Sequence, residues 1–210
     1  MTKKLACMAT ALVAFSAAQA NAGIVITEWA YSAANGEYIE LTNTGASAVD
    51  LTGWSYDDDG RVVGSTDLST LGLVNPGQSV ILTESTAAAF QTAWNLTGVA
   101  VLGGVIDNLG RNDEINVWDN NGVLVDRLTF GDQTFAGSIR TQNKSGNPIS
   151  AAALGANNPF QWQLSFIGDG YGTYASTGGD LGNPGINTVP EPATLALLAI
   201  GGIAMIRRRK

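Results

Sequence analysis

Residues 114–130 read EINVWDNNGVLVDRLTF. Apolar and β-branched side chains recur on both sides of the four residues Asp119-Asn120-Asn121-Gly122. These four residue types tolerate a positive φ, which tight turns between antiparallel strands require. The stretch therefore predicts a β-hairpin, and it is the strongest local signal in the chain.

Similar short apolar runs, separated by Gly, Asn and Asp, occupy the sequence on either side of the hairpin. This pattern favours a sandwich of antiparallel strands over alternating βαβ units. Strands are expected at Ile24–Trp29, Tyr38–Thr42, Gly53–Tyr56, Ser79–Thr83, Val99–Leu102, Glu114–Trp118, Val123–Phe130 and Gln161–Ile167. Trp54, next to Gly53, is predicted to fill space between the sheets, while Gly53 allows close backbone approach.

One segment departs from the strand pattern. Ser85 or Thr86 can cap a short helix that runs through Asn95. Phe90 and Trp94 would then lie four residues apart on one helix face, a spacing typical of core packing. We expect this helix to cover one end of a sheet.

Composition narrows the range of possible functions. The 210 residues include no histidine and one cysteine, Cys7, so Ser-His catalysis and most zinc chemistry are excluded. Residues 23–192 contain eighteen acidic and five basic side chains, a net charge of −13. Such a balance argues against nucleic-acid binding, which depends on clustered cations. It favours solubility, and also permits Ca²⁺ or basic partners.

The N-terminal stretch has the features of a secretory signal. Lys3 and Lys4 precede an apolar run over residues 5–18, and Ala20-Asn21-Ala22 supplies the small-x-small pattern that signal peptidase accepts. Residues 1–22 are therefore predicted to be a signal peptide, cleaved after Ala22 so that the mature chain begins at Gly23. Cys7 leaves with this segment, and no disulfide can then stabilise the mature protein.

The C-terminal stretch reads Val189-Pro190-Glu191-Pro192, then an apolar run over 193–206, then Arg207-Arg208-Arg209-Lys210. Clustered cations remain on the cytoplasmic side, which places the preceding chain outside the inner membrane. The fourteen apolar residues rise about 21 Å as a helix, so they predict a weak or temporary transmembrane anchor. A permanent single-pass anchor is the alternative.

Residues 188–210 resemble the PEP-CTERM sorting tail of Gram-negative bacteria that make exopolysaccharide. The resemblance implies transient anchoring in the inner membrane and cleavage by an exosortase-like enzyme near the Pro-Glu-Pro motif. It also implies delivery of the released protein to the cell surface or to the extracellular polysaccharide matrix.

A second resemblance covers roughly Ile24 to Asn187. Its motifs, in chain order, are Ile26-Thr27-Glu28, Glu37 to Asn43, Leu51-Thr52-Gly53-Trp54, Pro76-Gly77, Asn112 to Ile115, Asp119 to Gly122 and Asn183-Pro184-Gly185. In this order they resemble a lamin-tail domain, which implies an all-β, immunoglobulin-like antiparallel β-sandwich with one short helix over residues 23–187. Residues 136–159, rich in Gly, Ser, Ala and Asn, are interpreted as a possible long loop.

Three groups of side chains are candidate sites. Asp57-Asp58-Asp59-Gly60 could hold Ca²⁺, but a solvated turn is the simpler interpretation. Glu28, Glu37 and Glu40 could supply an acid pair, but Glu40 is expected to face outward from a half-buried strand. Four aromatic residues could stack on sugars or belong to the core: Trp118, Trp162, Tyr171 and Tyr174. No catalytic residue, cofactor site or metal ligand is assigned.

These features favour an exported, non-catalytic structural or interaction module. A polysaccharide-binding module is the first alternative. A calcium-dependent adhesion module, or an accessory domain of a secreted hydrolase system, is the second. The expected partners are signal peptidase, an exosortase-like enzyme, the inner membrane and exopolysaccharide, with no nucleic acid.

Overall fold

The computed structural model describes residues 23–186 of the chain. The predicted signal peptide at 1–22 and the predicted sorting tail, including its helix at 193–206, lie outside the described residues. Within residues 23–186, no helix is long and apolar enough to cross a membrane.

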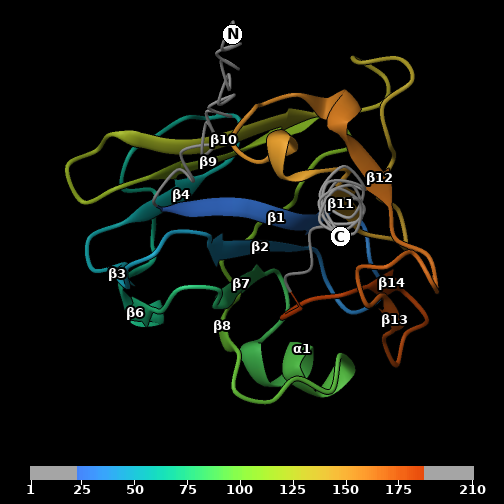
Figure 1. Ribbon diagram of the computed structural model, residues 1–210, viewed down its shortest axis with the longest axis horizontal. Helices are drawn as coiled ribbons and strands as arrows, with labels where there is room; N and C mark the ends of the chain where they lie inside the picture. The colour runs from blue at the N-terminus through green and yellow to red at the C-terminus, as the bar shows by residue number, and fades with distance from the viewer. Residues whose placement is uncertain (1–22, 187–210) are drawn as a thin grey trace, which may run out of the picture.

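The larger sheet contains six strands in the order β12-β11-β1-β2-β7-β8 (Figure 1). Their bounds are β1 Ile24–Ala30, β2 Tyr38–Asn43, β7 Ser79–Thr83, β8 Ala100–Gly103, β11 Gly146–Pro148 and β12 Trp162–Leu164. All pairings in this sheet are antiparallel except that of β7 with β8. The longest strands, β1 and β2, therefore lie at the centre.

The second sheet contains four antiparallel strands in the order β10-β9-β4-β5. Their bounds are β4 Ser55–Asp57, β5 Thr66–Asp67, β9 Asp113–Trp118 and β10 Leu124–Phe130. Two short strand pairs complete the described part of the fold. They are β3 Val49–Asp50 with β6 Leu73–Val74, and β13 Tyr174–Ala175 with β14 Leu181–Gly182. Single 3-10 turns lie at Ser69–Leu71, Ala151–Ala153 and Pro159–Gln161.

The predicted hairpin is confirmed as β9 and β10. The turn closes through a hydrogen bond from the Asp119 N–H to the Val123 carbonyl at 2.9 Å. The Asp119 carboxylate accepts from the backbone N–H groups of Asn121 and Val123 at 2.9 and 2.8 Å. Gly122 adopts the positive φ that the turn requires. An Asp side chain bonded to the backbone two residues ahead is the mechanism by which this residue type initiates turns.

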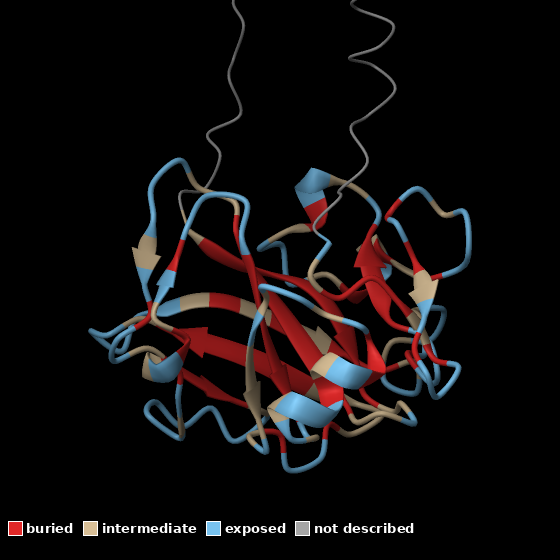
Figure 2. Ribbon diagram, turned by 90° about the horizontal axis from the view of Figure 1, so that it is seen from below, coloured by how far each residue is buried: buried red, intermediate tan, exposed pale blue. Residues whose placement is uncertain are grey.

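The main core lies between the two sheets, as expected for the immunoglobulin-like sandwich. Ile39 and Leu41 alternate along β2 and both are fully buried. Trp29 of β1 meets Phe130 of β10 with ring centroids 3.9 Å apart. Trp54 packs against this core while remaining half-buried. Figure 2 shows the central strands buried and the loops around them exposed.

Gly53 allows the backbone to pass close to a neighbouring segment, as predicted. Its φ is +77°, and a Cβ placed there would lie 3.1 Å from Cβ of Asn120 in the hairpin turn. A side chain at this position would therefore combine backbone strain with a tight contact.

The predicted helix is α1, Ala87–Ala93, with Thr86 as its N-cap. It connects β7 to β8, and this connection explains the one parallel pairing in the larger sheet. A strand that returns through a crossover helix re-enters the sheet in its original direction. Phe90 and Trp94 face the sheet and meet Tyr38 of β2 with centroid distances of 5.2 and 5.7 Å.

Residues 136–159 are more than a loop. They contain β11, which pairs with both β1 and β12. The sequence of this strand, Gly146-Asn147-Pro148, consists of residue types with low strand propensity, so no local pattern identifies it. Its place in the sheet comes from its neighbours rather than from its own composition.

Leu41 provides a test of the core. We expect Leu41→Ala to lower the free energy of unfolding by about 2–5 kcal/mol, because it removes a fully buried side chain between the sheets. The matched control is Leu124→Ala, whose side chain is 40 % exposed at the start of β10. Urea denaturation followed by tryptophan fluorescence measures both. Equal losses for the two variants would contradict the assigned core.

Candidate functional site

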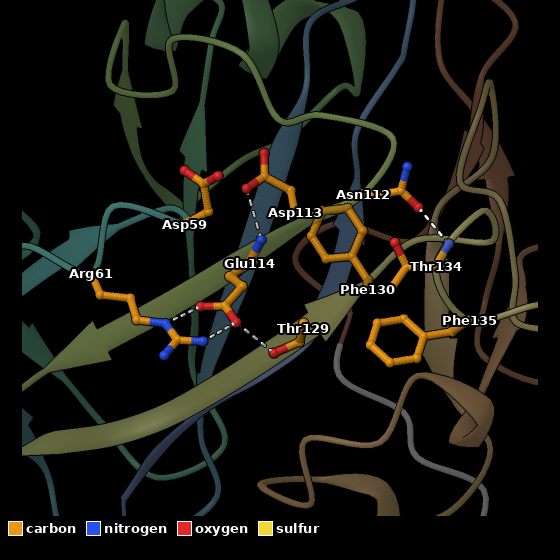
Figure 3. A pocket seen from close by; sticks show the side chains of 9 residues that line it. All are labelled: Asp59, Arg61, Asn112, Asp113, Glu114, Thr129, Phe130, Thr134 and Phe135. Carbon is orange, nitrogen blue, oxygen red and sulfur yellow. Dashed lines mark hydrogen bonds and ion pairs between the residues drawn. The ribbon is translucent and has the colours of Figure 1, made fainter.

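An open groove with a volume of about 380 Å³ lies at one end of the β9–β10 hairpin (Figure 3). One wall comes from the loop after β4, another from β9 and β10, and a third from the segment after β10. Its lining residues are Asp59, Arg61, Asn112, Asp113, Glu114, Thr129, Phe130, Thr134 and Phe135. We call this the hairpin groove.

A bidentate ion pair forms one side of the hairpin groove. Arg61 donates from Nε to Oε2 of Glu114 at 2.7 Å and from Nη2 to Oε1 at 2.6 Å. Thr129 Oγ1 also donates to Oε1, at 2.9 Å. The hydrogen bonds from Arg61 lower the pKa of Glu114 to about 2, so this carboxylate remains ionised at neutral pH. The Arg61 side chain is 54 % exposed, which leaves it accessible from solvent.

Asp113 extends the polar side. Its Oδ2 accepts from the Gly110 N–H at 2.6 Å and its Oδ1 accepts from the Glu114 N–H at 2.8 Å. Burial raises the pKa of Asp113. Both of its oxygens are already bonded to backbone amides, so this carboxylate organises the start of β9.

Aromatic rings form the other side. Phe130 is buried beneath the groove, while Phe135 is half-buried in its wall. Phe160 meets Phe135 edge to face at a centroid distance of 6.4 Å and is itself 56 % exposed. The groove thus combines an apolar wall with hydrogen-bonding groups, a combination typical of small-molecule sites.

No sequence pattern identifies Phe135 and Phe160, because they flank residues 136–159, the segment interpreted as a loop. The four aromatic residues considered as sugar-stacking candidates lie mainly in the interior. Trp118, Trp162 and Tyr171 are buried, and Tyr174 is half-buried against Trp94 at 5.5 Å. Their interpretation as packing residues is confirmed for the three buried rings.

Asp57 is the buried last residue of β4, and residues 58–60 form the turn that the simpler interpretation predicted. Asp57 accepts from the Val62 N–H at 2.7 Å, and Asp58 accepts from the Gly60 N–H at 3.2 Å. These carboxylates serve the backbone of their own loop. Across residues 23–186, no group of three or more acidic side chains is placed to hold a metal ion.

The expectation that Glu40 faces solvent is wrong. Glu28 of β1 and Glu40 of β2 lie directly opposite each other, and both are fully buried. They occupy the face of the larger sheet that points away from the second sheet, where the segment containing residues 181–186 covers them. Alternation of apolar and polar residues along a strand indicates that the polar face is exposed to solvent only when no other segment packs on that face.

The buried carboxylates hold this covering segment. Glu28 Oε1 accepts from the Asn183 N–H at 2.8 Å, and Glu40 Oε2 accepts from the Gly185 N–H at 2.6 Å. Tyr38 donates its hydroxyl to Glu28 Oε1 at 2.7 Å, and Ser145 donates to the same oxygen. We call Glu28 and Glu40 the carboxylate pair. Glu37 lies apart from it, accepting from the Leu109 N–H.

Gly182 makes the contact between the covering segment and the sheet possible. A Cβ at this position would lie 2.3 Å from the Tyr38 hydroxyl and 2.9 Å from Glu28 Oε1. Only a residue without a side chain can therefore pass over the carboxylate pair at this depth.

Ionisation of the carboxylate pair is unfavourable, because both carboxyl groups are buried and close to each other. Burial, together with the charge of the neighbouring Glu40, raises the pKa of Glu28 to about 8. Burial also raises the pKa of Glu40. Glu28 Oε2 has no hydrogen-bond partner among the described residues, so a proton on this carboxyl is favoured over a buried charge.

Of the residues predicted to direct processing, only Gly23 is described, immediately before β1. Ala20, Ala22, Val189, Pro190, Glu191, Pro192, Arg207, Arg208, Arg209 and Lys210 lie outside the described residues.

The carboxylate pair predicts a pH dependence of stability. The folded protein retains a proton on Glu28 that the unfolded chain loses above its ordinary pKa of 4.5. The free energy of unfolding should therefore fall by at least about 1.4 kcal/mol between pH 5 and pH 8, the equivalent of one pKa unit. Glu28→Gln should weaken this dependence, because the amide still accepts hydrogen bonds and carries no charge.

Urea denaturation across this pH range measures the effect, with the exposed Glu84→Gln as the matched control. A slope that is identical in the native protein and in Glu28→Gln would rule out Glu28 as its source.

Comparison with known families tests both resemblances. The Lamin Tail Domain family matches residues 17–132, which is more than half of the chain, and the PEP-CTERM protein-sorting motif matches residues 188–210. No curated protein matches the chain. The sorting motif indicates export and sorting to the cell surface of a Gram-negative bacterium, with processing by an exosortase-type enzyme. The chain therefore belongs to the lamin tail domain family, as a member that carries a PEP-CTERM sorting motif.

Proposed function

We propose that this protein is a non-catalytic structural or interaction module that reaches the cell surface or the exopolysaccharide matrix after processing at both ends. Signal peptidase removes residues 1–22, recognising Ala20 and Ala22 and leaving Gly23 as the new terminus. The apolar segment at 193–206 then anchors the exported chain in the inner membrane for a limited time.

The C-terminal processing step uses the remaining predicted residues. The cations Arg207, Arg208, Arg209 and Lys210 hold the chain end on the cytoplasmic side. An exosortase-type enzyme cleaves near the motif Val189, Pro190, Glu191 and Pro192. The acidic body of the protein is then released outward.

One observation supports the proposal: in the sequence, the described domain lies between the two predicted processing sites. β1 begins at Ile24, one residue after the predicted N-terminal cut. At the other end, the carboxylate pair fastens Asn183 and Gly185 to the sheet, and the matched sorting motif begins at residue 188. Cleavage at both sites removes the targeting segments and leaves the sandwich whole.

The chemistry of the hairpin groove supports a non-catalytic role. A general acid needs a pKa near the working pH, whereas Glu114 is held ionised by Arg61. Asp113 has both oxygens occupied by backbone amides. These carboxylates are therefore suited to fixed hydrogen bonding and unsuited to proton transfer.

Processing is tested by the intact mass of the protein recovered from culture fluid and from membranes. The released form should begin at Gly23 and lack Arg207 to Lys210. Pro190→Ala should leave full-length tail in the membrane fraction, because the sorting motif is altered. Pro76→Ala, in an exposed turn of the body, is the matched control and should be processed normally. Released protein that retains Lys210 would overturn the proposal.

Binding of a polysaccharide is a second candidate function, favoured by the hairpin groove. Sugar rings present an apolar face and a rim of hydroxyl groups. Phe135 is half-buried in the groove lining and meets the exposed ring of Phe160 beside the groove, while Arg61 and Asp59 supply donors and acceptors in the lining. The excess of carboxylates in the lining favours neutral or amino sugars over acidic ones.

Affinity electrophoresis in gels that contain the producing organism's exopolysaccharide tests this second function. The native protein should be retarded, and Phe160→Ala and Phe135→Ala should lose at least half of that retardation. Phe166→Ala is the matched control, because Phe166 is 51 % exposed and lies outside the groove lining, whereas Phe160 contacts the lining residue Phe135. An unretarded native protein, or an equal loss in Phe166→Ala, would exclude the groove as a sugar site.

A further inference from the structure

A second groove, with a volume of about 300 Å³, lies between the end of α1 and the last described residues of the chain. Its apolar lining comes from Trp94, Leu96, Val99, Tyr174, Pro184 and Ile186. The lining includes no Asp, Glu, Lys or Arg. We call this the tail groove, because the chain leaves the described domain at its edge.

Hydrogen bonds hold the wall formed by residues 184–186. Gly185 donates its N–H to Glu40, and Asn183 donates its N–H to Glu28. The Asn183 side chain donates from Nδ2 to the Ile186 carbonyl at 2.9 Å, and the Ile186 N–H donates to the Asn183 carbonyl at 2.9 Å. The position from which the following residues emerge is therefore set by the sheet.

The residues that follow are Asn187-Thr188-Val189-Pro190-Glu191-Pro192. Val189 comes three residues after Ile186, so an extended chain carries it at most about 10 Å from that residue. The groove and the first apolar residues of the sorting motif are thus within reach of each other. The uncharged, apolar groove suits Val189 and Pro190, whereas burial of the Glu191 carboxylate there would be costly.

We propose that the tail groove binds Val189 and Pro190 of the same chain and leaves Glu191 and Pro192 in solvent. The folded domain then presents its own sorting motif in one orientation, with the charged half free for a processing enzyme. Proline lowers the entropic cost of this docking, because its ring already restricts the backbone. The inference concerns how the motif is held, and it goes beyond the proposed export and release.

Thiol reactivity tests the docking. In the full chain, Cys7→Ser removes the only cysteine and Val189→Cys places a reporter at the docked position. The protein is solubilised in mild detergent and labelled with a maleimide. Leu96→Asp puts a charge into the groove and should raise the labelling rate of the reporter about tenfold, since protection depends on the docked state.

Ala89→Asp is the matched control, because Ala89 lies on the exposed side of α1 and should leave the rate unchanged. Circular dichroism verifies that both variants remain folded, and the reporter is also labelled in urea without any groove substitution. A reporter that reacts as fast in the native protein as in urea overturns the docking, whatever the result with Leu96→Asp. Export and release are read separately from the masses of processed protein, so either proposal can fail without the other.

Discussion

Burial of the central strands β1 and β2 on both faces is the constraint on which the rest of the structure depends. One face packs against the second sheet through apolar side chains such as Ile39 and Leu41. The other face carries Glu28 and Glu40, which cannot be buried without hydrogen-bond partners. The backbone amides of Asn183 and Gly185 supply two of those partners. The fold is therefore closed by polar contacts as well as by its apolar core.

This closure makes the C-terminal part of the body integral to the domain. The family match ends at residue 132, yet β11 and β12 extend the larger sheet beyond that point, and the segment at 181–186 covers its outer face. The targeting motif therefore follows a segment that is tied to the first strand of the fold. Removal of the tail would therefore leave the contacts of residues 183 and 185 with the larger sheet intact.

The two grooves differ in the charge of their linings, and this difference suits them to different ligands. The hairpin groove combines aromatic rings with an ion pair and further carboxylates, so it is suited to an external polar ligand. The tail groove is uncharged and adjoins the point at which the chain leaves the domain, so it is suited to an apolar segment of the same chain.

The sequence by itself determined the elements that depend on local chemistry: the hairpin with its Asp119 to Gly122 turn, the capped helix with Phe90 and Trp94, and the motifs of the two families. Only the tertiary structure decided that Glu40 is buried, that Gly146 to Pro148 form a strand, and that Phe135 meets Phe160. Turns and caps are encoded within a few residues. Burial and strand pairing depend on which distant segment packs on a surface. The alternation of residues along β2 therefore cannot predict that a segment more than a hundred residues further along the chain covers one of its faces.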